Sequence, residues 1–429
     1  MFTLFVNVRF VPDPPESRSS VLTYGIGWVL VQDNYILNVG YGSPPKFDIP
    51  PEAITVINGN GLWIAPGGID EQCNGFFSCN FGNATKEEII AALRQALAYG
   101  WSGLFITIIT DDPAKMIAAA KVAVEVANDP IYGPMVLGIK IEGPHFLPGP
   151  AIGAHDPVWI QPIIDEKVLY FPIREIVPAS MVLDFIIDPG CENALQFVIK
   201  ARKDGTSVGG GHADFGRDDP ARYLKLATYD EVASAGLNHW VHGGNGFRSM
   251  AYRNSLEQIW HDDIFGELGY LGLAFQDPRV QVGMILDFKH LLPWLVKKFL
   301  ELQGILGSHF TTDAMAAAGM GDGEFRIGSR TVFARGGVVY SDAEGKFLAG
   351  SATDPRTIIT NALSLGIKLE DAWQMMCFNV ARLFELDDQY GSLRIGNKAM
   401  LVLFSLENGQ VEIKLNVIDG NVLYRAPDF

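Results

Sequence analysis

Hydrophobic and polar residues alternate along this chain in two ways, one at its ends and another in its middle. Residues 1–64 and 379–429 hold short β-rich runs, such as VLTYGIGWVLV and MLVLFSL, separated by turn sequences such as NGNG. Between them, helical patterns at 86–100 and 112–128 each precede a continuous apolar run, LFITIIT and VLGIKIEG. Continuous apolar runs are typical of buried parallel strands, so their alternation with helices predicts parallel βα units.

The middle of the chain contains eight such strand-like runs. Their ends lie near Gln72, Thr110, Glu142, Asp188, His212, His242, Ile285 and Asp313. Eight βα units predict a closed (β/α)8 barrel of the TIM type, over residues 65–378, with its chemistry at the carboxyl ends of the strands. A doubly wound open sheet is the alternative, but no G-x-G-x-x-G motif follows the first strand. We expect the β-rich ends, 1–64 and 379–429, to form one small sheet domain beside the barrel.

The composition indicates an acidic globular chain. Its 429 residues include 33 Lys and Arg against 49 Asp and Glu, a net charge of −16, and 48% of them are hydrophobic. Such a chain can bury a large core, and its charge argues against nucleic acid or an anionic membrane as a partner. The four cysteines show no paired spacing, and no run of about 18 apolar residues is present. The start, MFTLFVNVRF, resembles a strand more than a signal peptide, so we expect a soluble cytoplasmic protein.

Four strand ends carry side chains that suit metal chemistry. Glu142, His212, His242 and Asp313 follow one another at intervals of 70, 30 and 71 residues. One βα unit takes roughly 30–40 residues, so these intervals equal about two, one and two units, and the side chains should converge on one mouth of the barrel. One carboxylate and two imidazoles are the ligand set of a catalytic divalent metal. A further carboxylate beside them is suited to move protons.

Each of these residues also has a purely structural interpretation. A single His near a strand end is more often a hydrogen-bonded structural residue than a ligand, and Glu142 alone could cap a helix or form an ion pair. Four such residues at barrel spacing favour the metal site. For His239 and His309, which lie within apolar runs, we expect buried, hydrogen-bonded side chains. The Phe-rich stretch FFSCNFG is either a lid over the site or part of the core.

Several motifs, in order along the chain, resemble those of the N-acetylglucosamine-6-phosphate deacetylases of the amidohydrolase superfamily. They are IAPGGIDEQCNG, GIKIEGPHFLPGPAIGAHDP, GHADFG, VHGGNGF, TTDAMAAAGMGDGEF, LAGSATD and NVARLFELDDQYGSLRIGNKAMLVLF. The resemblance extends from about Trp63 to Phe404. It implies a (β/α)8 barrel with a small β-sandwich made from both termini, a homodimer, and hydrolysis of the N-acetyl group of an amino sugar.

The resemblance also implies roles for particular residues. Glu142, His212 and His242 would bind one divalent metal ion, Zn²⁺, and Asp313 would act as general base and acid. His155 would bind the substrate near its acetamido group and stabilise the oxyanion. Asn245, Gly246 and Arg253 would contact the sugar phosphate.

The first strand favours a single metal ion. Many amidohydrolases carry H-x-H at this position and hold two metals, whereas this chain has Gln72-Cys73-Asn74. An amide is a poor ligand for such a metal compared with imidazole. We therefore expect Gln72 and Asn74 to contact substrate, and Cys73 to point away from the site into the barrel wall.

Departures from the family pattern leave open whether the substrate carries a phosphate. Ile285 stands where the family has a phosphate-holding His on strand seven, and Asn245-Gly246-Phe247-Arg248 replaces N-A-M-P. Arg248 or His290 could replace the missing contact; alternatively the substrate is an unphosphorylated sugar or a non-sugar N-acyl compound. A catalytically silent barrel used for binding is the remaining alternative.

Overall fold

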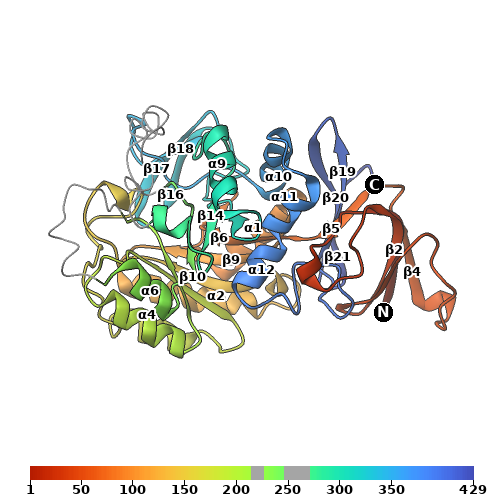
Figure 1. Cartoon of the computed structure of the whole chain (residues 1–429), viewed down its shortest axis with the longest axis horizontal. Helices are drawn as coiled ribbons and strands as arrows, with labels where there is room; N and C mark the ends of the chain where they lie inside the picture. Colours follow the sequence, from red (N-terminus) through yellow and green to blue (C-terminus); the bar gives the residue numbers. More distant parts are fainter. Residues whose placement is uncertain (214–226, 246–270) are drawn as a thin grey trace.

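The computed structural model describes residues 1–213, 227–245 and 271–429. Figure 1 shows an α/β body and, at one end of it, a β-sheet body beside which both chain termini lie. Among the described residues, none of the helices combines the length and the apolar character needed to cross a membrane.

Eight parallel strands build the α/β body. In spatial order they are β15 (Ser308–Phe310), β14 (Gln281–Met284), β13 (His239–Trp240), β12 (Ser207–Gly210), β11 (Val182–Ile187), β10 (Val136–Glu142), β9 (Trp101–Ile109) and β6 (Gly68–Cys73). A bridge between Cys73, at the end of β6, and Ala314, shortly after β15, nearly closes the barrel. Every strand ends within three residues of its predicted end. The predicted (β/α)8 barrel is confirmed.

Local sequence signals explain where the first helices begin. The Thr85 side chain accepts a hydrogen bond from the Glu88 N–H, and the Glu88 carboxylate accepts one from the Thr85 N–H, which forms a capping box. Asp112 caps the next helix, whose first residue is Pro113. The described α-helices are α1 (Lys86–Ala96), α2 (Pro113–Ala127), α3 (Tyr170–Ile176), α4 (Ala194–Lys203), α6 (Tyr229–Ala235), α9 (Pro293–Gln303), α10 (Pro355–Ser364), α11 (Leu369–Met376) and α12 (Phe378–Leu383).

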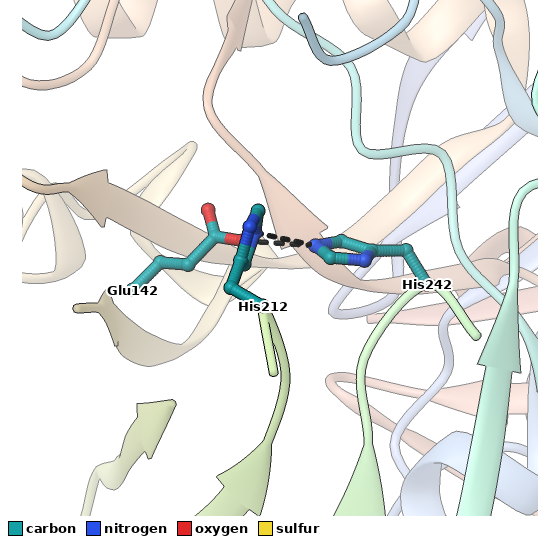
Figure 2. A group of neighbouring side chains, drawn as sticks. All are labelled: Glu142, His212 and His242. Carbon is teal, nitrogen blue, oxygen red and sulfur yellow. Dashed lines mark hydrogen bonds and ion pairs between the residues drawn. The ribbon is translucent and has the colours of Figure 1, made fainter. Parts of the chain in front are cut away.

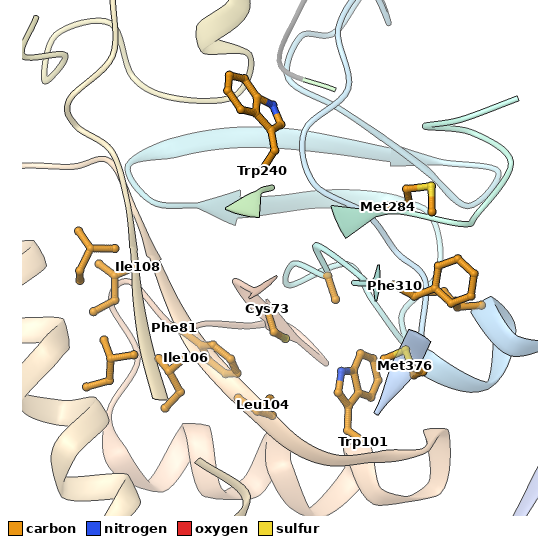
Figure 3. Close-up of a cluster of buried hydrophobic side chains, with 14 of the residues drawn as sticks. Cys73, Phe81, Trp101, Leu104, Ile106, Ile108, Trp240, Met284, Phe310 and Met376 are labelled. Atoms are coloured by element: carbon orange, nitrogen blue, oxygen red, sulfur yellow. The ribbon is translucent and has the colours of Figure 1, made fainter. Parts of the chain in front are cut away.

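The main core lies between the barrel strands and the surrounding helices. Figure 3 shows part of it, with Cys73 among apolar side chains that include Trp101, Leu104 and Ile106. Phe76 is fully buried and packs on Trp101 with ring centroids 4.9 Å apart. This part of the Phe-rich stretch therefore belongs to the core. Burial also raises the pKa of the Cys73 thiol well above its usual value.

Strands from both ends of the chain form the second sheet. Its order is β21 (Asn421–Arg425), β20 (Gln410–Ile418), β19 (Leu401–Glu407), β5 (Trp63–Pro66), β1 (Phe2–Phe10), β2 (Gly25–Gln32) and β3 (Tyr35–Tyr41), and β4 (Ile54–Asn58) pairs with β1. The antiparallel pairing of β5 with β19 joins the two ends. This sheet packs its own core, in which Phe5, Leu403 and Leu415 are fully buried. The limits 1–64 with 379–429 and 65–378 stay a prediction.

Two small sheets near the barrel mouth were not predicted. β7 (Gly75–Phe76) pairs with β8 (Cys79–Asn80), directly after the first barrel strand. β16 (Gly323–Ile327), β17 (Arg330–Arg335) and β18 (Val338–Tyr340) form an antiparallel sheet between β15 and α10. The latter sheet contributes to the site described next.

Candidate active site

Glu142, His212 and His242 converge at the carboxyl ends of neighbouring barrel strands (Figure 2). Glu142 is the last residue of β10, and the two histidines lie two residues beyond β12 and β13. The Glu142 Oε1 atom lies 3.0 Å from Nε2 of His212 and 3.0 Å from Nε2 of His242, and the two Nε2 atoms are 3.1 Å apart. All three side chains are buried. The spacing argument thus correctly predicted that these residues lie together.

The chemistry of these donor atoms fits a bound cation. His212 Nδ1 lies 2.8 Å from the Ala151 carbonyl oxygen, which can only accept, so Nδ1 carries a proton, and in the neutral ring Nε2 then holds a lone pair. That lone pair faces the Glu142 carboxylate at 3.0 Å. Two electron-rich atoms at this distance repel each other unless a cation lies between them. Burial lowers the pKa of His242, which favours the neutral imidazole that binds metal.

Asp313 lies beside this group and is held by two amides. Its Oδ1 accepts hydrogen bonds from Asn74 Nδ2 at 2.8 Å and from Gln72 Nε2 at 3.3 Å. Gln72 Nε2 also donates to Glu142 Oε1 at 2.7 Å, so one amide links the two carboxylates. Burial and the negative charge of Glu142 raise the pKa of Asp313 well above its usual value.

The backbone at three of these residues lies in the left-handed region. The φ angles are +51° at His212, +31° at His242 and +48° at Asp313. Residues with a Cβ rarely adopt such angles, and when they do the surrounding structure must hold them. The barrel therefore stores some backbone strain where its polar side chains converge.

His155 lies on a loop that reaches over this group. Its Nε2 is 3.2 Å from His212 Nε2, and its Nδ1 is 2.7 Å from the Thr110 hydroxyl. Arg330 of β17 donates to the carbonyl oxygens of Gly153 and His155, at 3.4 and 3.2 Å. The three-stranded sheet thus holds the loop that carries His155 in place. Burial lowers the pKa of His155 well below its usual value, which keeps this ring neutral.

These side chains line one pocket of about 420 Å³. Its lining residues are Asn74, Ile109, Glu142, Gly153, Ala154, His155, His212, His242, Asn245, His290, Asp313, Ile327, Leu348 and Gly350. Gln72 reaches the same place through its bonds to Glu142 and Asp313. The predicted site residues Gly246 and Arg253 lie outside the described residues, as does Arg248. The structure brings the other predicted residues together.

Sequence reasoning missed part of the pocket wall. Ile327 belongs to the three-stranded sheet and lies just beyond the end of the motif TTDAMAAAGMGDGEF. Thr110 had a usable signal, because it is the polar residue that ends the run LFITIIT. His290 was considered only as a phosphate contact; it lines the pocket, and its Nδ1 lies 2.8 Å from Asp287 Oδ2.

A second group of ionisable side chains lies inside the barrel. Glu71, Asp184 and His239 also have donor atoms close enough together to hold a metal ion. However, the Lys140 ammonium contacts both carboxylates, at 3.1 Å from Asp184 Oδ2 and still closer to Glu71. The cation of this group is therefore the ammonium. His309 Nε2 joins it at 3.1 Å from Glu71, so the expected buried, hydrogen-bonded state of His239 and His309 is observed.

Comparison with known proteins gives concordant results. The amidohydrolase family model matches residues 312–423. The chain is 28% identical over 364 residues to the N-acetylglucosamine-6-phosphate deacetylase of Vibrio furnissii, covering 82% of each chain. It is 26% identical to the N-acetylgalactosamine-6-phosphate deacetylase of Shewanella sp. (strain ANA-3), covering 85% of this chain and 84% of that one. The crystal structure of N-acetylglucosamine-6-phosphate deacetylase from Pasteurella multocida has a TM-score of 0.80 at 22% identity, over 98% of this chain and 99% of that one.

The fold, the site and the family match define a class of protein. The chain combines a (β/α)8 barrel with a carboxylate and two imidazoles at the carboxyl ends of its strands, and its residues 312–423 match the amidohydrolase family model. Over most of its length, the chain is similar to N-acetylglucosamine-6-phosphate deacetylases.

Proposed function

We propose that this protein is a metal-dependent hydrolase that removes the N-acetyl group of an amino sugar. The first candidate substrate is N-acetylglucosamine 6-phosphate, with glucosamine 6-phosphate and acetate as products. The observation that carries the proposal is the convergence of Glu142, His212 and His242 beside Asp313 in one pocket. The names of the two curated relatives, both deacetylases of N-acetylhexosamine 6-phosphates, support this substrate class.

Glu142, His212 and His242 are the proposed ligands of one divalent ion, Zn²⁺. Such an ion supplies Lewis-acid activation of the attacking water and of the acyl carbonyl. Gln72 and Asn74, which replace a second pair of imidazoles, use their amide N–H groups on Asp313 and Glu142. This use of the amides supports a single-ion site.

Asp313 is the proposed general base and acid. It accepts the proton of the attacking water, the C–N bond of the acetamide breaks, and Asp313 returns the proton to the departing amine. His155 lies where it can contact the acyl oxygen, with its ring held by Thr110. Among the described residues, the side-chain oxygens of Gln72 and Asn74 have no hydrogen-bond partner, so they can accept from substrate N–H or O–H groups.

Only some of the proposed contacts to the substrate's phosphate lie among the described residues. Asn245 lines the pocket, whereas the proposed contacts Gly246 and Arg253 lie outside the described residues. Ile285 is fully buried and offers no charge. Losing one charged contact to the phosphate would weaken the binding of a phosphorylated substrate by about 1.5–3 kcal/mol. The alternative substrate is therefore an unphosphorylated or non-sugar N-acyl compound. Comparing kcat/KM for N-acetylglucosamine 6-phosphate, its galactosamine epimer and the free sugars separates these cases.

The Asp313→Asn substitution tests the mechanism. We expect deacetylation, measured as amine release, to fall by about 10²- to 10⁴-fold, because the variant cannot accept the proton. The metal content of the purified protein should stay at the wild-type value. Asp111→Asn is the matched control, since Asp111 is a buried carboxylate at the same end of the barrel that does not line the pocket. Wild-type turnover by the Asp313→Asn variant would contradict the assignment.

Metal analysis separates the enzyme from a catalytically silent barrel. We expect about one Zn²⁺ per chain, with activity lost on chelation and restored by added metal. A protein that neither contains nor responds to divalent metal favours the silent barrel. From the family resemblance we also propose a homodimer, which light scattering of the purified protein tests, and from the cysteine pattern and the N-terminal sequence a cytoplasmic location.

A further inference from the structure

Asp70 is a fully buried carboxylate that the proposed mechanism does not use. It lies on β6, next to the seam where β6 and β15 meet as the two end strands of the barrel sheet. Asp313, the proposed general base, follows β15 on the other side of this seam. The contacts of Asp70 cross the seam and reach both neighbours of Asp313.

The hydrogen bonds of Asp70 concentrate on the residue before Asp313. Oδ1 accepts from the Thr312 N–H at 3.0 Å, and Oδ2 accepts from the Thr312 hydroxyl at 2.5 Å. The Thr312 hydroxyl oxygen in turn accepts from the Ala314 N–H at 2.9 Å. One carboxylate therefore fixes the amide before Asp313 directly, and the amide after it through one hydroxyl.

Three other donors hold Asp70 in place. Thr311 Oγ1 donates at 2.9 Å, Trp101 Nε1 at 2.8 Å, and the Gln72 backbone N–H at 3.4 Å. The last of these contacts matters for the site, because the Gln72 side chain donates to Asp313 and Glu142. Asp70 thus contacts the two chain segments that carry the carboxylate Asp313 and its amide donor.

The backbone conformation of Asp313 explains why these contacts are needed. Its φ of +48° is unfavourable for a residue with a Cβ and persists only where neighbouring contacts enforce it. Ser351 supports the other side of the turn, since its N–H donates to the Asp313 carbonyl at 2.7 Å. Asp70 and Thr312 supply the contacts to the N–H groups on both sides of Asp313.

We propose that Asp70 is a positioning residue for Asp313, acting through the Thr312 hydroxyl across the seam of the barrel. This proposal rests on the proposed function, in which Asp313 transfers the proton. Misplacing a catalytic group by about 1 Å can lower the rate by about 10²-fold, without a matching effect on ground-state binding. Loss of this contact should therefore lower kcat and leave KM and metal content nearly unchanged.

Two adjacent threonines provide a matched test in the metal-loaded protein. Thr311 and Thr312 are both fully buried and both donate a hydroxyl to Asp70, but only the Thr312 hydroxyl also accepts from Ala314. We expect Thr312→Val to lower kcat for N-acetylglucosamine 6-phosphate by tenfold or more, with KM and metal content within twofold. Thr311→Val, which removes one donor to Asp70 but leaves the Thr312 contacts in place, should lower kcat severalfold less than Thr312→Val. Thr312→Ser, which restores the hydroxyl, should recover most of kcat.

Hydrogen exchange supplies a readout that does not depend on the reaction. In Asp70→Asn and Thr312→Val, the amides of residues 312 and 314 should exchange at least tenfold faster than in wild type or Thr311→Val. If wild type does not deacetylate the sugar, the proposed function fails, and the exchange rates still decide the role of Asp70. Equal exchange in the two valine variants, or wild-type kcat in both Asp70→Asn and Thr312→Val, overturns the proposal.

Discussion

The amide side chains of Gln72 and Asn74 explain how two carboxylates remain close together in a buried site. Glu142 and Asp313 repel each other when both are charged, and burial adds to the cost. Gln72 donates to both carboxylates, and Asn74 donates to Asp313 alone. Because amide N–H groups occupy these two positions, the site can hold two carboxylates close together.

At the residue scale, we predict that Asn74→Asp reduces activity more than Asn74→Ala, although aspartate has the shape of asparagine. Alanine removes one hydrogen bond to Asp313, worth about 1.5–3 kcal/mol for a charged acceptor, or about 10- to 100-fold in kcat/KM. Aspartate also places a like charge against Asp313, which raises the pKa of the pair further. Steady-state assays of both variants at pH 7–8 check the order. An Asn74→Asp variant more active than Asn74→Ala would contradict it.

At the scale of elements, the buried charges below the site tie five barrel strands together. Lys140 of β10 contacts Glu71 of β6 and Asp184 of β11, while His239 of β13 and His309 of β15 contact the same carboxylates. All five side chains are fully buried. An irregularity in the pairing of β6 with β9 between Asp70 and Cys73 accompanies this arrangement. These five buried side chains thus hold together the strands that carry or lead to the site residues Gln72, Glu142, His242 and Asp313.

We predict that Lys140→Met destabilises the protein by about 3–5 kcal/mol, because it leaves two buried carboxylates without their cation. Urea unfolding followed by fluorescence measures the change. Lys115→Met is the control, since Lys115 of α2 is largely exposed, although its partner Asp111 is buried. That variant should lose at most about 1 kcal/mol. A Lys140→Met protein as stable as the control would show that the contacts of Lys140 with Glu71 and Asp184 do not stabilise the folded state.

At the scale of the whole molecule, the sequence predicted the barrel well because its parallel strands are continuous apolar runs that end in polar residues. Glu142, His212, His242 and Asp313 could be placed by spacing alone. Lys140 could not, because a charge inside the run GIKIE carries no sign of its partners on other strands. The sheet β16–β18 was also missed: its strands are short and largely half-exposed, and they face the barrel mouth through tertiary contacts only.

The two ends of the chain meet at Asp13, and the ionisation of this residue makes the stability of the folded state depend on pH. This residue follows β1, and its Oδ2 accepts a hydrogen bond from the Leu393 N–H at 2.9 Å, shortly before β19. Burial raises the pKa of Asp13 from 3.8 to about 7, against the smaller opposing effects of the bonds from Ser19 and Leu393. Below about pH 4 the carboxyl group is protonated in both the folded and the unfolded chain. As the pH rises towards 7, the unfolded chain releases this proton while the folded one keeps it.

The folded state should therefore lose stability as the pH rises through this window, and the loss should end above about pH 7. We predict that the free energy of unfolding of wild type, relative to Asp13→Asn, falls by about 2–3 kcal/mol between pH 5 and pH 8. Urea titrations at several pH values measure this difference. Asp48→Asn, at an exposed position, should reproduce the pH dependence of wild type. If wild type and Asp13→Asn differ by the same free energy at every pH, Asp13 is ionised in both states, and the junction between the chain ends holds a buried charge.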